Sequence, residues 1–450
     1  QYNLPVTPII GFDGKMDFSW FLARKYIEPK YRKRAESYHG KYVKEARRLI
    51  VEDLKQDGLL LKTDENYTHR IGLCYKCKNA LEPLPLEQWF VKVKPLAEKA
   101  IEAVKKGEIK INPKSFENHY FQWMENLRDW NISRQIVWGI RIPAWHCHKC
   151  KKWTVTEGDT PETCSECKSH DIKQDTDTFD TWFSSSQWPY VTLKTTKPGD
   201  FEKFYPTSVM ETGYDILRAW VSRMIMMGLY ITGKVPFRDV LVHGLVNDPY
   251  GKKMSKSKGN VVNAIDLVEQ YGADAMRFAL IYGNATGNDQ SLSYSKLDAA
   301  RKFTNKLWNI GRFITLCHPE RSEGSRDFDL RQNDIQRLFG EAKHKKDKEM
   351  IKKVQDLASE VTKDLENYNF NCAAEKLYDC TWHTFADKII ESYKPRLMKN
   401  PKTAHSEAAY QTLETILLES LKMLHPFMPF ITEEIYQKFR PGEILMVEKW

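Results

Sequence analysis

The chain has 450 residues, which is long enough for two or three domains with cores of their own. Its 69 Lys and Arg against 60 Asp and Glu leave a net charge of +9, which permits a nucleic-acid partner without requiring one. The chain starts at Gln1 without a basic, apolar leader, and its longest apolar run, from Met224 to Ile231, is too short to span a bilayer. We therefore expect a soluble, cytoplasmic protein that makes no membrane contact.

The first 106 residues predict a hairpin and two helices. Residues 6–16 alternate around an Asp13-Gly14 turn, which predicts two short strands. A lone hairpin is marginally stable, so we expect its partners to lie elsewhere. Apolar residues at helical spacing predict a helix from Tyr42 to Asp57 that ends at Gly58, and a second helix is predicted over residues 96–106.

Six of the nine cysteines form three CxxC pairs, which indicates metal binding in a reducing compartment rather than disulfides. The pairs Cys147/Cys150 and Cys164/Cys167 are thirteen residues apart, in a polar, turn-rich segment typical of a zinc ribbon. Four thiolates leave no open position, so we expect a structural zinc. His146 and His148 are alternative ligands, and unmetallated thiols are the other interpretation.

The pair Cys74 and Cys77 is only half of a tetrahedral site. Its missing ligands would come from the later pairs or from outside this chain, and two free thiols are the alternative.

Two stretches predict a ligand site at the ends of neighbouring strands. Residues 205–213 read as a strand that ends at Gly213, and the helix predicted after it carries Ile216 and Trp220 on its apolar face. Most of this face is expected to be core. The first turn of this helix lies at the carboxyl end of the strand, where ligands bind in α/β proteins. The Asp215 carboxylate in this turn is therefore suited to accept hydrogen bonds from ribose hydroxyls. Trp182 and Trp220 are candidates for the walls of an apolar pocket.

The second stretch is a loop of four lysines and two serines, Lys252 to Asn260, flanked by Gly251 and Gly259. It follows an apolar strand-like run, residues 240–246, and precedes a helix predicted over residues 264–282. No P-loop or dinucleotide fingerprint explains these lysines. A mobile loop with ammonium and hydroxyl groups suits a polyphosphate, and a solvated basic loop is the alternative.

Past residue 290 the pattern predicts successive helices over residues 299–313, 352–368, 372–393 and 408–439. Residues 319–344 are polar and charged, and we expect a loop or linker there. A purely structural helical domain is the simple interpretation of this region.

The string KMSKS at residues 253–257 resembles the signature of class I aminoacyl-tRNA synthetases. The ordered strings NISRQIVWGIRIPAW, DTFDTWFSSSQWPY, FYPTSVMETGYDI, VLVHGLV and KMSKSKGN, with the cysteine ribbon, resemble the valyl-tRNA synthetase family. The isoleucyl relatives usually have Asp where this chain has Ser184, and Gln where it has Ile216. The resemblance therefore favours valine over isoleucine.

The resemblance implies Mg-bound ATP and L-valine as substrates, a structural zinc, and tRNA as partner. It assigns pyrophosphate contacts to Lys253, Lys256 and Ser257 and adenylate contacts to Thr212, Gly213 and Asp215. It places His243, Gly244 and Val246 beside the adenine. It forms the amino-acid pocket from Trp182, Ile216 and Trp220.

We therefore predict the second half of a class I nucleotide-binding, Rossmann-like α/β fold with a zinc-ribbon insertion, followed by an all-α bundle. Residues 1–80 would be the end of the editing insertion, 81–290 the catalytic part and 291–450 the anticodon-binding bundle. Within the catalytic part, the ribbon would be residues 145–175 and the lysine loop residues 249–260.

The family's His-Ile-Gly-His element and the first half of the nucleotide-binding fold have no match in this sequence, and the catalytic residues of the editing domain cannot be assigned. We therefore expect a fragment or one part of a split enzyme, inactive without a separate chain that carries the other half. The alternatives are an isoleucyl-tRNA synthetase and a non-catalytic tRNA-binding remnant.

Overall fold

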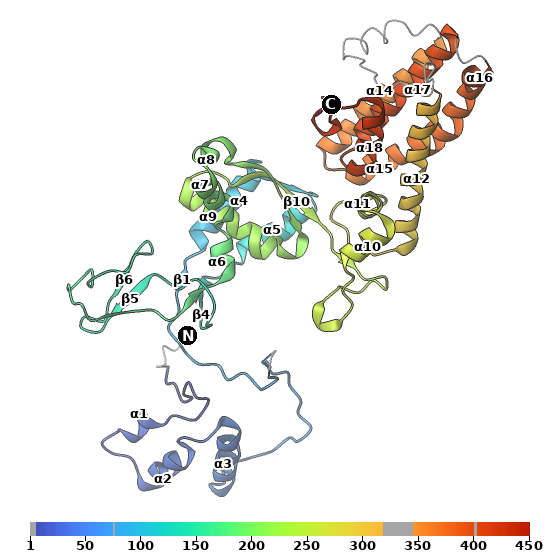
Figure 1. Cartoon of the computed structure of the whole chain (residues 1–450). Helices are drawn as coiled ribbons and strands as arrows, with labels where there is room; N and C mark the ends of the chain where they lie inside the picture. The colour runs from blue at the N-terminus through green and yellow to red at the C-terminus, as the bar shows by residue number, and fades with distance from the viewer. Residues whose placement is uncertain (1–5, 75–76, 318–344, 400–402) are drawn as a thin grey trace. The chain divides into compact units, whose positions relative to one another are not determined.

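The computed structural model describes residues 6–74, 77–317, 345–399 and 403–450 (Figure 1). The side chains of Ser257 and Lys399 are outside the description, and so is the linker predicted over residues 319–344. The chain divides into two compact units, residues 1–90 and 91–450. Among the described helices, none combines the length and the apolar character that crossing a membrane needs.

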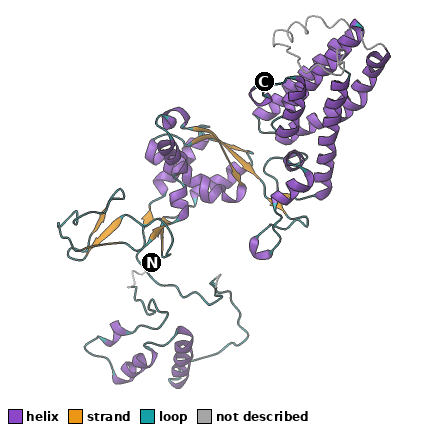
Figure 2. Cartoon of the chain, in the orientation of Figure 1, coloured by secondary structure: helices purple, strands orange, loops and turns teal. Residues whose placement is uncertain are grey.

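The first unit is built from helices and loops (Figure 2). Its helices are α1 (Ser19–Leu22), α2 (Pro29–Tyr38) and α3 (Val43–Gln56). The helix predicted from Tyr42 to Asp57 is confirmed as α3, and Gly58 follows it with a left-handed φ of 68°. The predicted hairpin is reduced to a single antiparallel bridge between Ile10 and Met16. Met16 packs on α3 in a small core, and α2 was not predicted.

A three-stranded parallel sheet is the centre of the second unit. Its strands, in spatial order, are β2 (Lys110–Asn112), β10 (Phe237–His243) and β9 (Thr207–Gly213). The strand predicted over residues 240–246 therefore starts earlier and ends at His243. The chain then forms a second short strand, β11 (Val246–Asn247), which pairs with β12 (Gln290–Ser291).

Three helices cover this sheet and share its core: α4 (Lys94–Lys105), α5 (Phe116–Glu125) and α9 (Ser222–Thr232). The prediction of a helix over residues 96–106 is confirmed as α4. The helix predicted directly after Gly213 is wrong in its first two turns. A 3₁₀ turn (Tyr214–Ile216) and a π-helical turn (Leu217–Val221) precede α9, so ordinary helical spacing does not hold there.

The remaining short elements of this part form the ribbon and the segments beside it. The strands are β1 (Phe90–Val91), β3 (Trp130–Asn131), β4 (Ser133–Arg134), β5 (Ala144–Cys147), β6 (Trp153–Val155), β7 (Ile172–Gln174) and β8 (Thr178–Phe179). The helices are α6 (Thr181–Ser185), α7 (Trp188–Thr196) and α8 (Asp200–Phe204). Strands β6, β5 and β7 form the antiparallel ribbon sheet, and β4 pairs with β8.

Helices make up the rest of the second unit and share one large core. They are α10 (Ala264–Tyr271), α11 (Ala273–Ile281), α12 (Tyr294–Leu316), α14 (Lys345–Glu366), α15 (Phe370–Asp379), α16 (Glu391–Lys399), α17 (Ala404–Leu424) and α18 (Pro429–Phe439). A π-helical segment (Cys380–Ile390) joins α15 to α16, and a 3₁₀ turn (Leu445–Val447) follows α18.

The helices predicted over residues 299–313 and 352–368 are confirmed as α12 and α14, and the run 372–393 is helical throughout. Two other predictions of single helices are wrong. Gly272, with a φ of 92°, divides the run 264–282 into α10 and α11. Residues 425–428 divide the run 408–439, because Pro429 cannot donate a helical hydrogen bond and so begins α18.

Candidate active site and metal centre

The candidate active site lies where β9 and β10 end. These strands are parallel, and their register pairs Val242 with Thr212 and His243 with Gly213. The residues predicted at the two strand ends therefore lie at one edge of the sheet, as expected for carboxyl ends of parallel strands. The Nε2 atom of His243 lies 3.0 Å from the Glu211 carboxylate, so these two exposed side chains pair across the strands.

The lysine loop reaches this edge through one contact. Lys253 Nζ lies 3.3 Å from Asp215 Oδ2, which joins the loop to the turn that follows β9. Both side chains are exposed, so the ion pair adds little stability. It does place an ammonium group next to the carboxylate predicted to bind ribose.

The ends of the lysine loop are tied together by a buried carboxylate that was not singled out from the sequence. Asp248 accepts hydrogen bonds from the amides of Tyr250 and Lys252, at 3.0 and 2.8 Å, and from Asn260 Nδ2 at 2.8 Å. The bond from the Asn260 side chain, with these amides, lowers the pKa of Asp248. The Oδ1 atom of Asn260 in turn accepts from the amide of Ser255 at 2.9 Å. Asp and Asn around a Pro-Tyr-Gly turn are the sequence signal for this tie.

Between these ties the loop stays open to solvent. Lys253, Lys256 and Lys258 are exposed, and a 3₁₀ turn over Lys256–Lys258 ends at Gly259, whose φ is 68°. The loop therefore presents three exposed ammonium groups within six residues, on a backbone held by the hydrogen bonds of Asp248 and Asn260. This arrangement suits a large anion that binds from solvent.

A tight crossing of two backbones follows β10. A Cβ atom on Gly244 would lie 1.9 Å from the carbonyl oxygen of Asn288, so no side chain fits there. The Asp289 carboxylate accepts from the amide of Leu245 at 2.7 Å and from the Tyr214 hydroxyl at 3.1 Å, and the latter bond raises the pKa of Tyr214. Val246 continues from this crossing into β11.

An open cavity of about 380 Å³ adjoins the crossing. Its walls come from α5, from the turns after β9 and from the segment before β12. They consist of Phe116, His119, Tyr214, Leu217, Arg218, Gly287, Asn288 and Asp289. None of these residues was predicted as part of the site, because the sequence signal lies only in the strand ends that the segment 287–289 crosses.

Trp220, one of the residues predicted to line an apolar pocket, is held by a hydrogen bond and lies beside a second indole ring. Its indole Nε1 donates to the carbonyl oxygen of Ser185 at 3.2 Å, and its ring lies 6.0 Å from that of Trp188. Trp182 and Ile216 are half-buried, on α6 and on the 3₁₀ turn that precedes the π-helical turn of Trp220. Helix α6 therefore packs on the π-helical turn and brings the three predicted pocket residues into one region of the fold.

A buried carboxylate holds α6 in place. Asp180 caps α6, accepts from the indole Nε1 of Trp130 at 3.0 Å and pairs with Arg134 at 3.0 Å. Sequence patterns did not single out Asp180, although Asp directly before a helical run is a capping signal. It links the strand segment at residues 130–134 to the predicted pocket.

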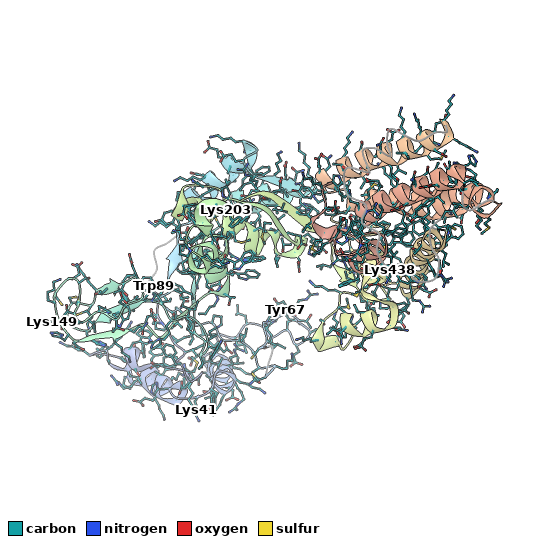
Figure 3. All side chains as sticks on the ribbon, turned by 45° about the horizontal axis from the view of Figure 1, so that its top comes forward. Lys41, Tyr67, Trp89, Lys149, Lys203 and Lys438 are labelled. Atoms are coloured by element: carbon teal, nitrogen blue, oxygen red, sulfur yellow. The ribbon has the colours of Figure 1, made fainter. Side chains whose placement is uncertain are left out.

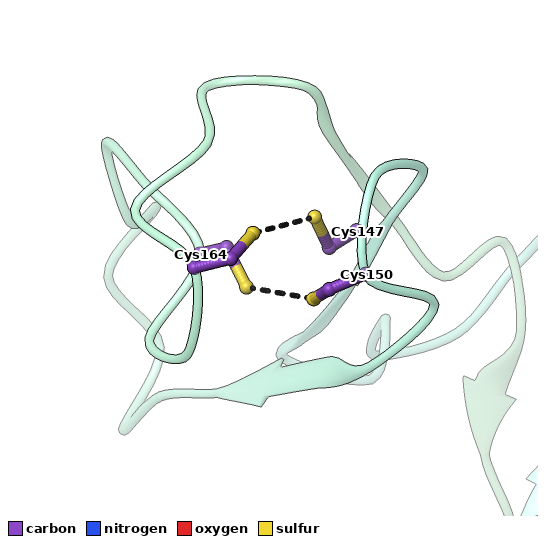
Figure 4. A group of neighbouring side chains, drawn as sticks. Cys147, Cys150 and Cys164 are labelled. Carbon is purple, nitrogen blue, oxygen red and sulfur yellow. Dashed lines mark hydrogen bonds between the residues drawn. The ribbon is translucent and has the colours of Figure 1, made fainter.

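The four ribbon cysteines form a cluster of sulfur atoms (Figure 4). Their Sγ atoms all lie within 4.8 Å of one another, with Cys147 and Cys167 3.6 Å apart and Cys150 and Cys164 also 3.6 Å apart. Thiolates bound tetrahedrally to zinc lie about 3.8 Å apart, so the cluster fits that ion. The ring of His146 instead lies 5.0 Å from that of Trp153, at a tilt of 59°.

Backbone amides favour the thiolate form of two of these cysteines, Cys147 and Cys164. The amide of Cys150 lowers the pKa of Cys147, and the amide of Cys167 lowers the pKa of Cys164 to about 6. Hydrogen bonds to the charged form favour the thiolate, which is the form that binds metal.

The backbone directly after Cys77 resembles the backbone that follows each of the two ribbon pairs. Lys78, Lys151 and Lys168, each directly after a CxxC, have φ values of 60°, 60° and 56°. The amide of Lys78 donates to the carbonyl oxygen of Cys74 at 2.9 Å, as the amide of Lys151 does to that of Cys147. Within the described residues, the ribbon cysteines are the one group of three or more His, Cys, Asp or Glu side chains placed to share a metal ion.

Comparison with known families identifies the class that this fold and site define. The family of class I tRNA synthetases for isoleucine, leucine, methionine and valine matches residues 73–293, and the anticodon-binding domain of tRNA ligases matches residues 347–450.

Two solved structures have the same fold. A LeuRS–tRNA–LeuAMS complex from Agrobacterium radiobacter K84 has a TM-score of 0.57 and 23% identity, over 72% of this chain and 43% of that chain. A methionyl-tRNA synthetase from Mycobacterium tuberculosis, in complex with methionyl-adenylate, has a TM-score of 0.57 and 18% identity, over 82% and 65%.

The chain belongs to the valine–tRNA ligase family. It is 44% identical to the valine–tRNA ligase of Clostridium acetobutylicum over 401 residues, 89% of this chain and 44% of that protein. It is 45% identical to the enzyme of Symbiobacterium thermophilum over 443 residues, 97% and 45% of the two proteins. The chain thus spans about half the length of the curated relatives it matches. The predicted family and fold class are confirmed.

Proposed function

We propose that this chain contributes to the ATP-dependent ligation of valine to tRNA(Val) through a valyl-adenylate. The observation that carries this proposal is the joining of the lysine loop to the ends of β9 and β10 through the pair of Lys253 and Asp215. The chain's place among valine–tRNA ligases supports valine over isoleucine. It also favours an enzyme over a tRNA-binding remnant, because a remnant would not need the lysine loop.

The first step joins valine to ATP. A carboxylate oxygen of valine attacks the α-phosphorus, the bond to the bridging oxygen breaks, and Mg-bound pyrophosphate leaves. In our proposal Lys253 and Lys256 stabilise the charge that builds on the pyrophosphate, and the role of Ser257 follows from the family resemblance. The polyphosphate draws Lys253 away from Asp215, and the freed carboxylate then accepts hydrogen bonds from the ribose hydroxyls.

The adenylate and the adenine lie along the strand ends in this proposal. Thr212 and Gly213, at the end of β9, hold the adenylate. His243, Gly244 and Val246 lie beside the adenine, where the absence of a side chain at Gly244 lets the two backbones cross. In the second step a terminal ribose hydroxyl of tRNA attacks the activated carbonyl carbon, and AMP leaves.

The amino-acid pocket consists of Trp182, Ile216 and Trp220, whose apolar surfaces suit a short branched side chain. An apolar pocket separates valine from threonine by only about a hundredfold, a figure that comes from these synthetases themselves. This limit is the physical reason for a separate editing domain in the family.

We assign a structural zinc to Cys147, Cys150, Cys164 and Cys167, where the spacing of the sulfur atoms fits the ion. When bound, zinc would hold the two knuckles of the ribbon together, because this segment has few apolar side chains of its own. The shared turn geometry supports Cys74 and Cys77 as half of a second zinc site.

The proposed domains are residues 1–80 for the end of the editing insertion, 81–290 for the catalytic part and 291–450 for the anticodon-binding bundle. The free side of β9 is where the first half of the nucleotide-binding fold would add, whether it lies on the same longer chain or on a separate one. Among the described strands, β9 pairs only with β10, so another parallel strand can add at its other edge. A chain that carries the His-Ile-Gly-His half would supply that strand and the rest of the ATP site. We place the complete enzyme in the cytoplasm.

ATP–pyrophosphate exchange tests this proposal with valine, isoleucine and threonine, with and without the N-terminal half of a valyl-tRNA synthetase. We expect exchange that requires the added half and prefers valine. Preference for isoleucine would refute the substrate assignment. No exchange in any combination, with tRNA binding retained, would favour the binding remnant, and full activity of the chain alone would refute the split enzyme.

A further inference from the structure

The positive charge of this chain is concentrated in one short segment. Residues 24–48 contain ten Lys and Arg and three Glu, so they account for +7 of the chain's net +9. We call residues 24–48 the basic segment. It lies in the first unit and comprises the loop before α2, α2 itself and the start of α3. Neither family match includes it, since the first begins at residue 73.

Half of these cations are already paired within the unit. Lys30 and Arg34 contact Asp57, Lys41 contacts Glu45, Arg47 contacts Glu82 and Arg48 contacts Glu52. Figure 3 shows the side chains around the labelled Lys41. Among the described residues, no carboxylate lies within ion-pair distance of the other five. These are Arg24, Lys25, Arg32, Lys33 and Lys44.

The unpaired cations differ in how firmly they are held. Arg32 is half-buried and donates to the carbonyl oxygens of Leu22 and Arg24, at 3.3 and 3.5 Å, so it fixes the loop between α1 and α2. Lys25, Lys33 and Lys44 are exposed. The result is a fixed backbone that presents uncompensated ammonium groups to solvent.

Aromatic rings accompany these cations. Arg24 stacks on Trp20, with 4.9 Å between the guanidinium carbon and the ring centre, and the Tyr26 side chain next to it is 82% exposed. Lys30 lies over Tyr31 at 5.8 Å. Cations interleaved with exposed rings are typical of surfaces that bind the phosphates and stack on the bases of single-stranded nucleic acid.

An anionic membrane surface is the competing partner for basic and aromatic residues. A helix that lies on lipid needs a continuous apolar face. Helix α2 has none to offer: its one buried residue is Ala35, while Lys33, Glu36 and Ser37 are exposed. The surface therefore fits RNA better than lipid.

We propose that the basic segment binds the sugar-phosphate backbone of tRNA, with Lys25, Lys33 and Lys44 contacting phosphates and Tyr26 stacking on an unpaired base. This inference rests on the proposed function for the identity of the RNA. It adds an RNA contact outside the synthetase and anticodon-binding regions.

The test is tRNA binding by the full 450-residue chain, measured by fluorescence anisotropy with a labelled tRNA(Val) transcript between 50 and 200 mM NaCl. The variant K25Q/K33Q/K44Q removes three charges. Its matched control, K99Q/K197Q/K234Q, removes three exposed lysines from the second unit. We expect the first variant, and not the control, to lower the slope of log affinity against log salt by about 2 to 3.

Tyr26 gives a second, independent measurement. We expect Tyr26→Ala to weaken tRNA binding at least about fivefold and Tyr26→Phe to preserve it, because stacking needs the ring and not the hydroxyl. Thermal unfolding should be unchanged in both variants, since the ring is exposed.

Three outcomes would overturn the proposal. They are wild-type tRNA binding by K25Q/K33Q/K44Q, an equal loss in the control, and a lysine-dependent affinity for phosphatidylserine vesicles without an effect on tRNA. Valine-dependent pyrophosphate exchange with the added N-terminal half involves no tRNA, so these variants should leave it unchanged. A failure of the proposed function would therefore show in exchange and a failure of this inference in tRNA binding.

Discussion

Gly244 offers the sharpest test of the site's architecture. A Cβ atom at this position would lie 1.9 Å from the carbonyl oxygen and 2.1 Å from the carbonyl carbon of Asn288, and 2.5 Å from the amide nitrogen of Asp289. All three are backbone atoms, so no rotamer change can relieve the overlap. We predict that Gly244→Ala forces the segment 287–289 away from the end of β10 by more than an ångström.

The cost follows from the contacts that this displacement breaks. The Asp289 carboxylate would lose the amide of Leu245, now at 2.7 Å, and the amide of Gln290 would lose the carbonyl oxygen of Leu245, at 3.0 Å. Overpacking costs about 1–3 kcal/mol. The two hydrogen bonds, one of them to a charged acceptor, add about 2–4 kcal/mol. Together these terms predict a loss of about 3–7 kcal/mol in the free energy of unfolding of the second unit.

Urea unfolding followed by tryptophan fluorescence measures the loss of stability, and hydrogen exchange of the Leu245 amide reports the local displacement. Gly311→Ala is the matched control, because its Cβ would meet side-chain atoms of the buried Ile435, the nearest at 2.7 Å, rather than the backbone of a crossing segment. We expect this control to cost less and to leave exchange at Leu245 unchanged. Native stability and native exchange in Gly244→Ala would show that the two backbones do not cross as described.

Three further predictions concern the metal cluster and the lysine loop, and a fourth concerns a half-buried thiol. Cys164→Ser should lose zinc, measured by elemental analysis of the purified chain, because three thiolates and a hydroxyl bind the ion more weakly. Lys256→Gln, with the added N-terminal half, should slow valine-dependent exchange by about 10²–10³, and an unchanged rate would exclude a role in charge stabilisation. The pKa of Asp248 is lowered in the folded chain, so the stability it contributes is present above its usual value near 4 and is lost as pH falls through the folded pKa. Hydrogen exchange of the two loop amides bonded to it should therefore accelerate in acid, and should not do so in Asp248→Asn. Burial raises the pKa of the Cys380 thiol to about 11, so Cys380 should resist alkylation at pH 8 while the exposed Cys77 reacts, as peptide mass spectrometry would show.

Helix boundaries show where local patterns were sufficient and where they were not. The periodicity of residues 43–56 predicted α3 within one residue at each end, because one face of that helix is apolar and Gly58 stops it. Over residues 264–282 and 408–439, the spacing of apolar residues predicted one helix where the structure has two. Apolar residues continue through both runs, since both halves of each run pack on the same core, and only backbone geometry at Gly272 and Pro429 separates the helices.

The sequence by itself determined the family of this protein. The ordered motifs identified that family, and the CxxC spacing and the lysine loop predicted four metal ligands and a polyphosphate loop, because each depends on residue types at fixed local separations. Only the tertiary structure decided how the site is held together. Asp180 and Asp289 act through partners that are brought near by packing, and the crossing at Gly244 joins segments more than forty residues apart. Such contacts leave no periodic trace in the sequence, because they depend on where the sheet and its loops lie in space.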